Sequence, residues 1–404
     1  MKLLLLVDWS YPCDHQFLTE VYAKNFIDKG HELTWVMRPQ DPNHQTIEYK
    51  NWNDSEVYIL PSSAYNPGRD AARFFTGRIQ SNPLFKTDID FTKFDLVHVR
   101  NDLSMGLAAC YLANEFELPY VHQISHLKAN SLIEEAKQGF NGRTSWIKGH
   151  LGKKLRRYVA NSSDMVLPIS DAMKRYLQNN SYTTPMQTLP TGAEVVGDIP
   201  TENILREKYG IDEEYVLLYM GSMSPSRKLE FLFDVLNVLE IDYDVNLVMV
   251  GGRLKSNRER LKQAANKKGV SDIVKFTGWV SDRVQIQSAI ATADVGLSPL
   301  PTDSVLSTNA PIKTLEYMSL GTPVVASTTP DQQDVLKTSR AGLAVDYKVK
   351  SFVDAIDELL SSEERRNRMG KRGRDYIRNN RNFGVLSDLV EDIYNQVIRE
   401  NKNE

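Results

Sequence analysis

Cysteine is nearly absent from this sequence: only Cys13 and Cys110 occur in 404 residues. Two cysteines cannot build the disulfide framework of a small secreted domain or, by themselves, a zinc site, so a reducing cytoplasm is the natural compartment. Long apolar runs are also absent. Residues 3–7 are apolar but end at Asp8, which is too short for a signal-peptide core or a membrane span and suits a first buried strand.

An excess of charge of one sign is missing too. The net charge is −3, with 41% hydrophobic and 25% charged residues, an ordinary mix for a globular chain. No general attraction to nucleic acid follows from it, so no nucleic-acid partner is expected. The length is sufficient for two independent hydrophobic cores.

Several catalytic motifs are missing as well. No G-x-G-x-x-G follows the first predicted strand, which argues against a dinucleotide dehydrogenase, and there is no G-x-S-x-G, H-E-x-x-H or Walker loop. Two D-x-D triplets, at 88–90 and 242–244, follow no suitable strand and are interpreted as surface carboxylates. The sequence therefore predicts no metal site and no cofactor.

What the sequence does contain is a strand–helix alternation that occurs twice. Residues 2–7 predict a strand, 17–29 a helix, and a second strand ends at Met37. After a Pro- and Gly-containing linker at 189–193, a strand at 215–220 restarts the pattern. We expect an α/β chain with Rossmann-like, doubly wound domains at 1–190 and 191–380, followed by a helical segment at 381–404.

The second half is organised around residues 308–327. Pro311 suits a first helical turn, Gly321 suits the position after the helix, and Pro323 prevents continuation into the buried strand that follows. The loop before this helix lies where open parallel sheets bind ligands. Glu316 is acidic among apolar neighbours. It is either an exposed helix residue, which spacing alone favours, or a carboxylate that accepts hydrogen bonds from ribose hydroxyls.

This stretch resembles the nucleotide-binding signature of the retaining glycosyltransferases of family 4, which have the two-Rossmann-domain GT-B fold. That signature is E-x7-E followed by Ala/Tyr-Met-x-x-Gly-x-Pro-Val-Val-Ala. Glu316 matches the second Glu, Thr308 replaces the first, and Pro311-Ile312-Lys313 fits a Pro-x-Lys variant. The resemblance implies two domains facing a cleft, retaining and metal-independent transfer from a nucleoside-diphosphate sugar, and a C-terminal helix that packs on the first domain.

The donor site is expected in the second domain. Gly221 allows close backbone approach, and Arg227 and Lys228 at the start of a helix suit a diphosphate, although an ordinary basic turn is about as probable from spacing alone. In the resemblance Lys228 matches the usual Lys, Ser222 stands where an Arg is usual, and Arg227 replaces the lost charge. The resemblance further implies donor contacts from two loops. These contacts come from Thr308, Asn309 and Ala310 and, around the base, from Trp279 and Val280, with Trp279 alternatively in the core.

The first domain is expected to bind the acceptor. His126 follows the carboxyl end of a predicted strand at 120–123 and, by the resemblance, contacts the donor sugar as a catalytic residue with Arg227 and Lys228. His122 is the alternative. The first loop, 9–16, lacks the glycines usual in the family, which leaves His15 or Gln16 as substitutes for a phosphate contact.

Residues 143–157 combine an apolar stripe with six Lys or Arg residues. They form either a solvated basic face or a contact with anionic lipid, for which about 1 kcal/mol per charge gives an upper limit of ~6 kcal/mol. Residues 139–149 are predicted to be a loop, and 66–86, with interleaved Arg and Phe, either a locally packed loop or an acceptor- or membrane-facing one. The expected localisation is cytoplasmic, either free or at a membrane.

The sequence thus predicts a glycosyltransferase that moves a sugar from a nucleotide sugar to a glycan, lipid-linked or small-molecule acceptor. Thr308 in place of the first Glu, together with the glycine-free first loop, motivates an alternative. In this alternative the chain is a non-catalytic partner subunit that binds a protein or glycan. A nucleotide-sugar epimerase on a similar fold would need catalytic carboxylates that are not identifiable in the sequence.

Overall fold

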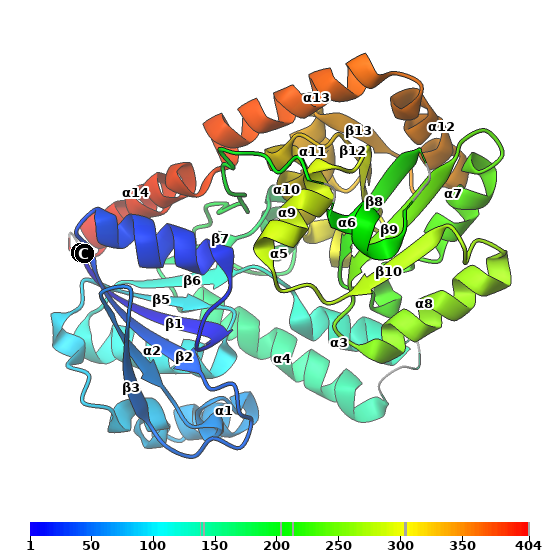
Figure 1. Cartoon of the computed structure of the whole chain (residues 1–404). Coiled ribbons are helices and arrows are strands. Elements are labelled where there is room, and N and C mark those ends of the chain that lie inside the picture. Colours follow the sequence, from blue (N-terminus) through cyan, green and yellow to red (C-terminus); the bar gives the residue numbers. More distant parts are fainter. Residues whose placement is uncertain (138, 140–141, 203, 212–213, 303–304, 403–404) are drawn as a thin grey trace. The chain divides into compact units, whose positions relative to one another are not determined.

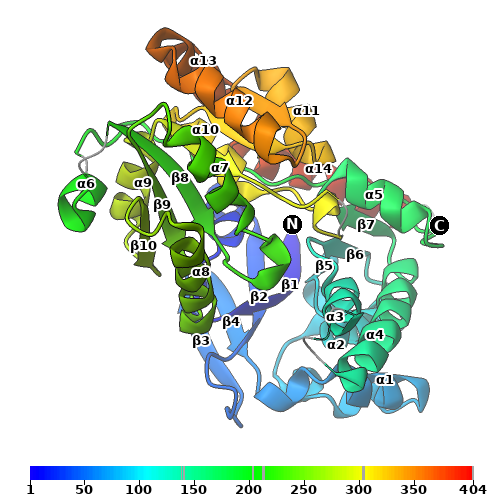
Figure 2. The same ribbon diagram turned by 90° about the vertical axis from the view of Figure 1, so that its right-hand side faces the viewer.

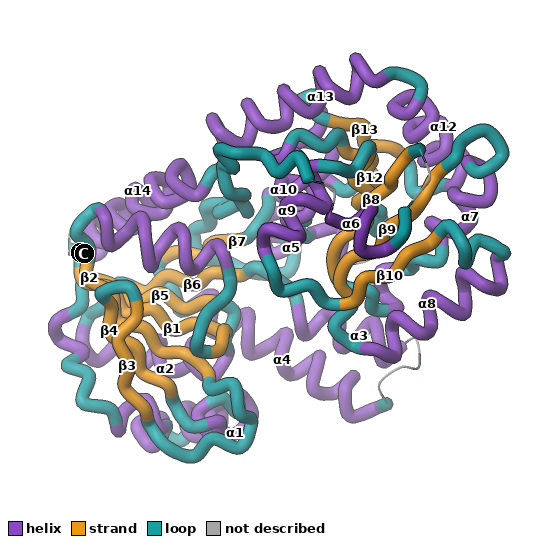
Figure 3. The backbone as a smooth tube through the Cα atoms, viewed as in Figure 1, coloured by secondary structure: helices purple, strands orange, loops and turns teal. Residues whose placement is uncertain are grey.

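The computed structural model describes the chain except for residues 138, 140–141, 203, 212–213, 303–304 and 403–404. The chain forms two compact units. Unit 1 contains Met1–Pro190 and Phe383–Glu404, and unit 2 contains Thr191–Asn382. In each unit a sheet lies between helices (Figures 1 and 3).

The sheet of unit 1 has six parallel strands and one antiparallel edge strand. Its strands are β1 (Lys2–Ser10), β2 (Glu32–Arg38), β3 (Glu48–Trp52), β4 (Ser55–Ile59), β5 (Leu96–Arg100), β6 (Tyr120–Ile124) and β7 (Met165–Pro168). They are arranged in the order β3-β4-β2-β1-β5-β6-β7, with β3 antiparallel to β4. β3 was not predicted, because this edge strand is largely exposed and has no apolar pattern.

The longer helices of unit 1 are η1 (Phe17–Phe26, a π-helix), α1 (Pro67–Phe75), α2 (Leu103–Phe116), α3 (Lys128–Lys137), α4 (Arg143–Asn161), α5 (Asp171–Gln178) and α14 (Phe383–Asn401). Short 3₁₀ turns are η2 (Ser62–Ala64), η3 (Ile79–Ser81), η4 (Pro83–Lys86) and η5 (Phe91–Lys93). The predicted loop at 139–149 is wrong from residue 143 onward, where α4 begins, and its residues 140–141 lie outside the described part. The predicted loop at 66–86 is largely helical.

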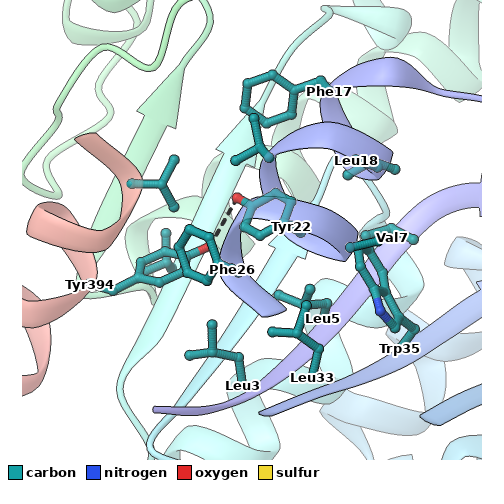
Figure 4. Packing of buried hydrophobic residues seen from close by; sticks show 14 of the residues in the cluster. Leu3, Leu5, Val7, Phe17, Leu18, Tyr22, Phe26, Leu33, Trp35 and Tyr394 are labelled. Carbon is teal, nitrogen blue, oxygen red and sulfur yellow. Dashed lines mark hydrogen bonds between the residues drawn. The ribbon is translucent and has the colours of Figure 1, made fainter. Parts of the chain in front are cut away.

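Helix α14 packs against η1 in the core of unit 1. The hydroxyls of Tyr22 and Tyr394 are 3.0 Å apart and buried (Figure 4). The hydroxyl of Tyr394 also lies 2.7 Å from Nδ1 of buried His98. The final helix is therefore part of the first unit, although it is separated from it in sequence by the whole of unit 2.

The sheet of unit 2 is entirely parallel. Its strands are β8 (Tyr215–Gly221), β9 (Val245–Gly251), β10 (Val274–Gly278), β11 (Val295–Ser298), β12 (Val324–Ser327) and β13 (Gly342–Val345). Its helical segments are α6 (Ile204–Tyr209), η6 (Pro225–Arg227), α7 (Phe231–Leu239), α8 (Lys255–Lys268), α9 (Arg283–Ala291), η7 (Val305–Thr308), α10 (Ile312–Leu320), α11 (Pro330–Ser339), α12 (Val349–Leu360), α13 (Glu363–Tyr376) and η8 (Ile377–Arg381). Helices α7, α8 and α12 pack on one face, and α9, α10 and α11 on the other (Figure 2).

Both sheets repeat one topology. The unit 2 order is β10-β9-β8-β11-β12-β13, and the six parallel strands of unit 1 follow the same plan. Numbered along each unit, both read 3-2-1-4-5-6, the doubly wound Rossmann arrangement. The prediction of two such domains is confirmed. The strand order reverses between β1 and β5 in unit 1 and between β8 and β11 in unit 2, and ligands of such sheets bind outside the carboxyl ends of the strands at that point.

Candidate functional site

Helix α10 is anchored to the sheet at the switch point of unit 2. The hydroxyl of buried Tyr317 accepts a hydrogen bond from the Met220 amide at 2.9 Å and donates to the Leu218 carbonyl at 3.2 Å. Its ring lies against Gly296 of β11, where an added Cβ would be 2.5 Å from ring carbons. These contacts fix α10 across β8 and β11, so residues one turn earlier lie near the ends of those strands.

Lys313 is four residues before Tyr317 and shares its side of the helix. Its ammonium lies 4.1 Å from the centroid of the Tyr219 ring. Its Nζ and Cε would both be 3.5 Å from a Cβ added at Gly221, the last residue of β8. Gly221 has φ +132, a conformation that side chains disfavour. The strand end thus leaves its backbone open beside a lysine.

Glu316 directly precedes Tyr317 on α10 and lies three residues after Lys313. It is partly buried. Burial raises the pKa of its carboxyl group, opposed by the positive charges of Arg283 and Lys313. Glu316 therefore lies within electrostatic reach of two cations, Arg283 and Lys313. The expectation that spacing alone favoured, an exposed helix residue, is wrong because Glu316 is partly buried.

Arg227 and Lys228 lie in the turn after β8. Arg227 ends η6 and is partly buried, whereas Lys228 is exposed and adopts φ +49. The Lys228 carbonyl accepts a hydrogen bond from the Tyr347 hydroxyl at 3.0 Å. The two side chains therefore differ: Arg227 approaches Lys313 closely enough to lower its pKa, and Lys228 lies at the surface.

The remaining predicted donor residues lie in two loops. Thr308 and Ala310 are buried and Asn309 is partly buried, directly before the first turn of α10. Trp279 follows β10 and is 56% exposed, with the Arg253 guanidinium 4.5 Å from its ring centroid, which excludes the core alternative for Trp279. Val280 packs against the core beneath α9 and α10.

Gln332 was missed by the sequence analysis and supports the site from behind. Its buried side chain accepts a hydrogen bond from the Thr314 hydroxyl at 3.0 Å and donates to the Ser327 carbonyl at 3.1 Å and the Thr329 hydroxyl at 3.0 Å. It connects α10 with β12 and α11. Nothing in the sequence around this glutamine distinguishes it from a surface residue of an amphipathic helix.

A second polar cluster lies at the switch point of unit 1. Asp8 of β1 accepts a hydrogen bond from the buried guanidinium of Arg100, at the end of β5, at 2.7 Å. Asn101 donates to Asp8 at 3.1 Å and to Ser125 Oγ at 2.7 Å, and accepts from the Ser125 amide at 2.8 Å. The cluster therefore joins the carboxyl ends of β1, β5 and β6.

Two histidines of unit 1, His126 and His15, lie beside this cluster and differ in exposure. His126 is exposed, with Nδ1 3.4 Å from Ser125 Oγ. Neighbouring protein atoms displace part of the water around the ring and lower the pKa of His126, although Asp8 opposes the shift. His15 accepts a hydrogen bond from Arg100 at 3.1 Å. Burial, and to a smaller extent the positive charge of Arg100, lowers the pKa of His15 to about 4. Both rings are therefore neutral near pH 7.

His122, the alternative, is buried inside β6 and bonded to the Tyr120 hydroxyl at 2.7 Å. Asp8, Arg100 and Asn101 were not selected from the sequence. The available signal was that a polar residue ends or follows each of two buried strands.

Two family models match the chain on either side of the linker. The model described as Glycosyltransferase Family 4 matches residues 19–195, and the model described as Glycosyl transferases group 1 matches residues 201–376. The chain belongs to the retaining glycosyltransferases of family 4. It has the GT-B fold and is an enzyme that transfers a sugar from a nucleotide sugar.

Relatives of known activity include lipid-modifying transferases. Alpha-monoglucosyldiacylglycerol synthase of Streptococcus pneumoniae is 24% identical over 373 residues, covering 89% of this chain and 78% of that protein. A GDP-mannose-dependent alpha-(1-6)-phosphatidylinositol dimannoside mannosyltransferase of Mycobacterium tuberculosis is 27% identical over 194 residues, 47% of this chain and 48% of that protein.

Similar solved structures show the same fold. Sucrose-phosphate synthase of Thermosynechococcus elongatus has a TM-score of 0.75 at 18% identity, covering 99% of this chain and 100% of that one. Anabaena HepE in complex with UDP has a TM-score of 0.65 at 14% identity, covering 98% and 100%. In the described part of this transferase, no helix has the length and hydrophobicity needed to cross a membrane.

Proposed function

We propose that this transferase moves a sugar from a nucleoside-diphosphate sugar to a lipid or lipid-linked acceptor at an anionic membrane surface. In the donor site the diphosphate lies near Arg227 and Lys228, ribose hydroxyls donate to Glu316, and the loop at 308–310 contributes backbone amides. Trp279 and Val280 border the base. Fixed cations stabilise the departing diphosphate, which is where negative charge accumulates in the reaction, so the mechanism needs no metal.

His126 contributes to the same reaction from unit 1, where it contacts the transferred sugar. Its support is its place just after β6, beside the polar cluster of Asp8, Arg100 and Asn101. A neutral imidazole can accept a hydrogen bond from a sugar hydroxyl. We propose that this cluster holds the loop that carries His126.

The acceptor assignment rests on one observation, the outward face of α4. Ile147, Leu151, Lys154 and Tyr158 recur at spacings of three or four residues and therefore share one face. Exposure of the hydrophobic members is large, 51% for Ile147, 61% for Leu151 and 41% for Tyr158. The stripe from Ile147 to Tyr158 is about 16 Å long at 1.5 Å per residue.

The opposite side of α4 packs on α3, which leaves the face with Ile147 and Leu151 exposed to solvent. An added Cβ at Gly149 would be 2.6 Å from Ile133 and 2.8 Å from the Ala129 carbonyl, so α4 packs tightly on α3 through glycine. Trp146, 46% exposed, and Phe75 of α1, 63% exposed, extend the apolar surface. The ring centroids of Phe75 and Tyr158 are 5.3 Å apart, so Phe75 packs against the stripe.

Cations flank the stripe, and α4 contains no acidic residue. Fewer than the six cations counted in the sequence are exposed to a membrane. Arg156 is buried against Tyr182 and Asn130, and Lys153 bonds Asn180 at 3.0 Å. Four exposed cations remain: Arg143, Lys148, Lys154 and Arg157. At about 1 kcal/mol each they limit the attraction to ~4 kcal/mol, enough for reversible docking.

A cavity with a mixed polar and apolar lining adjoins the stripe at Tyr158. It has a volume of about 550 Å³ and is lined by Phe74, Ile79, Tyr111 and Tyr158, among others. Names of two relatives, which modify diacylglycerol and phosphatidylinositol glycolipids, agree with a lipid acceptor. Hydrophobic surface beside cations without carboxylates is the combination that an anionic bilayer recognises.

Vesicle flotation tests this proposal. The unaltered protein should float with vesicles of phosphatidylcholine and phosphatidylglycerol but not with phosphatidylcholine alone. Replacing Ile147 and Leu151 by Asp should abolish flotation and transfer to vesicle-borne lipid. The matched control is Ile241→Asp, since Ile241 is 76% exposed in unit 2. Equal flotation of the double variant and the control would refute the docking surface.

A further inference from the structure

The first turn of α10 contains a cation in an unfavourable place. Lys313 is the second residue of the helix, where the positive end of the helix dipole disfavours a lysine. It is partly buried and lies near a second cation, Arg227. Burial and Arg227 both lower its pKa, and Glu316 only partly opposes them. Folding alone gives no reason for a positive charge here.

Neither cation forms an ion pair within the described part of the chain, although Glu316 partly compensates the charge of Lys313. The polar contact of Lys313 is with the face of the Tyr219 ring. The Lys313 side chain approaches the open backbone of Gly221 at the end of β8, which is the switch point of the sheet, and Arg227 lies in the turn that follows the same strand. Two cations without an ion-pair partner at the ligand end of a parallel sheet form a site suited to an anion.

We infer that Lys313 is a ligand of the donor's diphosphate and acts together with Arg227. The inference rests on the proposed donor site and adds a residue to it. Ser222 gives the turn after β8 no charge, and Lys228 is at the surface with its carbonyl bonded to Tyr347. Lys313 supplies from α10 a second partly buried charge, in addition to the surface charge of Lys228.

The aromatic contact offers a competing role, in which Lys313 only packs on Tyr219. Lys313→Met separates the two roles, because methionine keeps the apolar stem over the ring and removes the charge. Lys313→Arg keeps the charge. The matched control is Lys337→Met, an exposed lysine on α11 of the same unit.

Calorimetry with UDP, GDP, uridine and guanosine tests the inference. For the diphosphate that binds the unaltered protein, Lys313→Met should weaken affinity roughly 10- to 150-fold, the loss of one hydrogen bond to a charged group. Lys313→Arg should recover most of it, Lys337→Met should change nothing, and binding of the matching nucleoside should be unaffected in all variants. The melting temperature of unliganded Lys313→Met should equal or exceed that of the unaltered protein, because a disfavoured charge is removed.

The outcomes separate this inference from the proposed function. Diphosphate binding that is unchanged by Lys313→Met would overturn the role of Lys313 and leave the donor site intact. Equal weakening of diphosphate and nucleoside would also overturn it, since the residue would then act through packing. Failure of the unaltered protein to bind either diphosphate would overturn the donor site and this inference with it.

Discussion

Replacing Glu316 by Gln tests the ribose contact of the donor site. The carboxylate is partly buried and its pKa is raised, so the folded unit gains nothing from its charge at this position. Glutamine keeps the shape and removes the charged acceptor. The amide oxygen of glutamine still accepts a hydrogen bond, so the loss is the difference between a charge-assisted bond and a neutral one, roughly 1–1.5 kcal/mol, which corresponds to roughly 5- to 12-fold weaker binding.

The substitution has a second, opposing effect on diphosphates. Removing the negative charge leaves Lys313 and Arg283 less compensated, which favours an anion. The nucleoside is therefore the cleaner ligand. We expect calorimetry to show the full loss with the nucleoside and an equal or smaller loss with the diphosphate, and thermal melting to show no loss of stability. Unchanged nucleoside affinity would refute the assignment of Glu316 to the ribose.

Three further predictions follow from named contacts. Diphosphate affinity should fall as pH rises, because burial and Arg227 lower the pKa of Lys313 below 10.5 in the free protein, whereas a bound diphosphate raises that pKa. Calorimetry at several pH values should show this fall in affinity for the unaltered protein and not for Lys313→Arg. Tyr317→Phe should lower the free energy of unfolding of unit 2 by about 1–3 kcal/mol in urea titration, since the partly buried amide of Met220 loses its acceptor, and an unchanged midpoint would contradict that contact. Unit 1 should lose stability as the pH falls from 6.5 toward 3, because His98 takes up a proton near pH 6.5 in the unfolded chain, whereas burial lowers its pKa to about 3 in the folded chain. A melting temperature that stays constant over this range would exclude the effect.

The helix at the centre of the donor site could be predicted from local chemistry. Pro311 and Gly321 bound it in the sequence, and the structure confirms the helix between them, Ile312–Leu320, with Gly321 at φ +85. Such signals are local, so no knowledge of neighbouring elements is needed. The exposed edge strand β3 has no comparable signal, because its residues alternate neither in polarity nor in burial.

The partners of polar residues could not be predicted in the same way. Asp8 and Arg100 are 92 positions apart and meet because β5 lies beside β1, which is a property of the strand order. Lys313 reads as a solvated lysine until Tyr317 is known to face the sheet, since only then does the four-residue spacing direct Lys313 toward Gly221. The position of a site followed from the alternation of elements, and its detailed composition required the fold.

A crystal structure of unit 2 or the whole chain with UDP or GDP bound tests the central claim most directly. We predict diphosphate oxygens within hydrogen-bonding distance of Arg227 and Lys313 beside Gly221, and ribose hydroxyls on Glu316. A nucleotide bound elsewhere, or bound here with both cations directed away from its phosphates, would contradict the account.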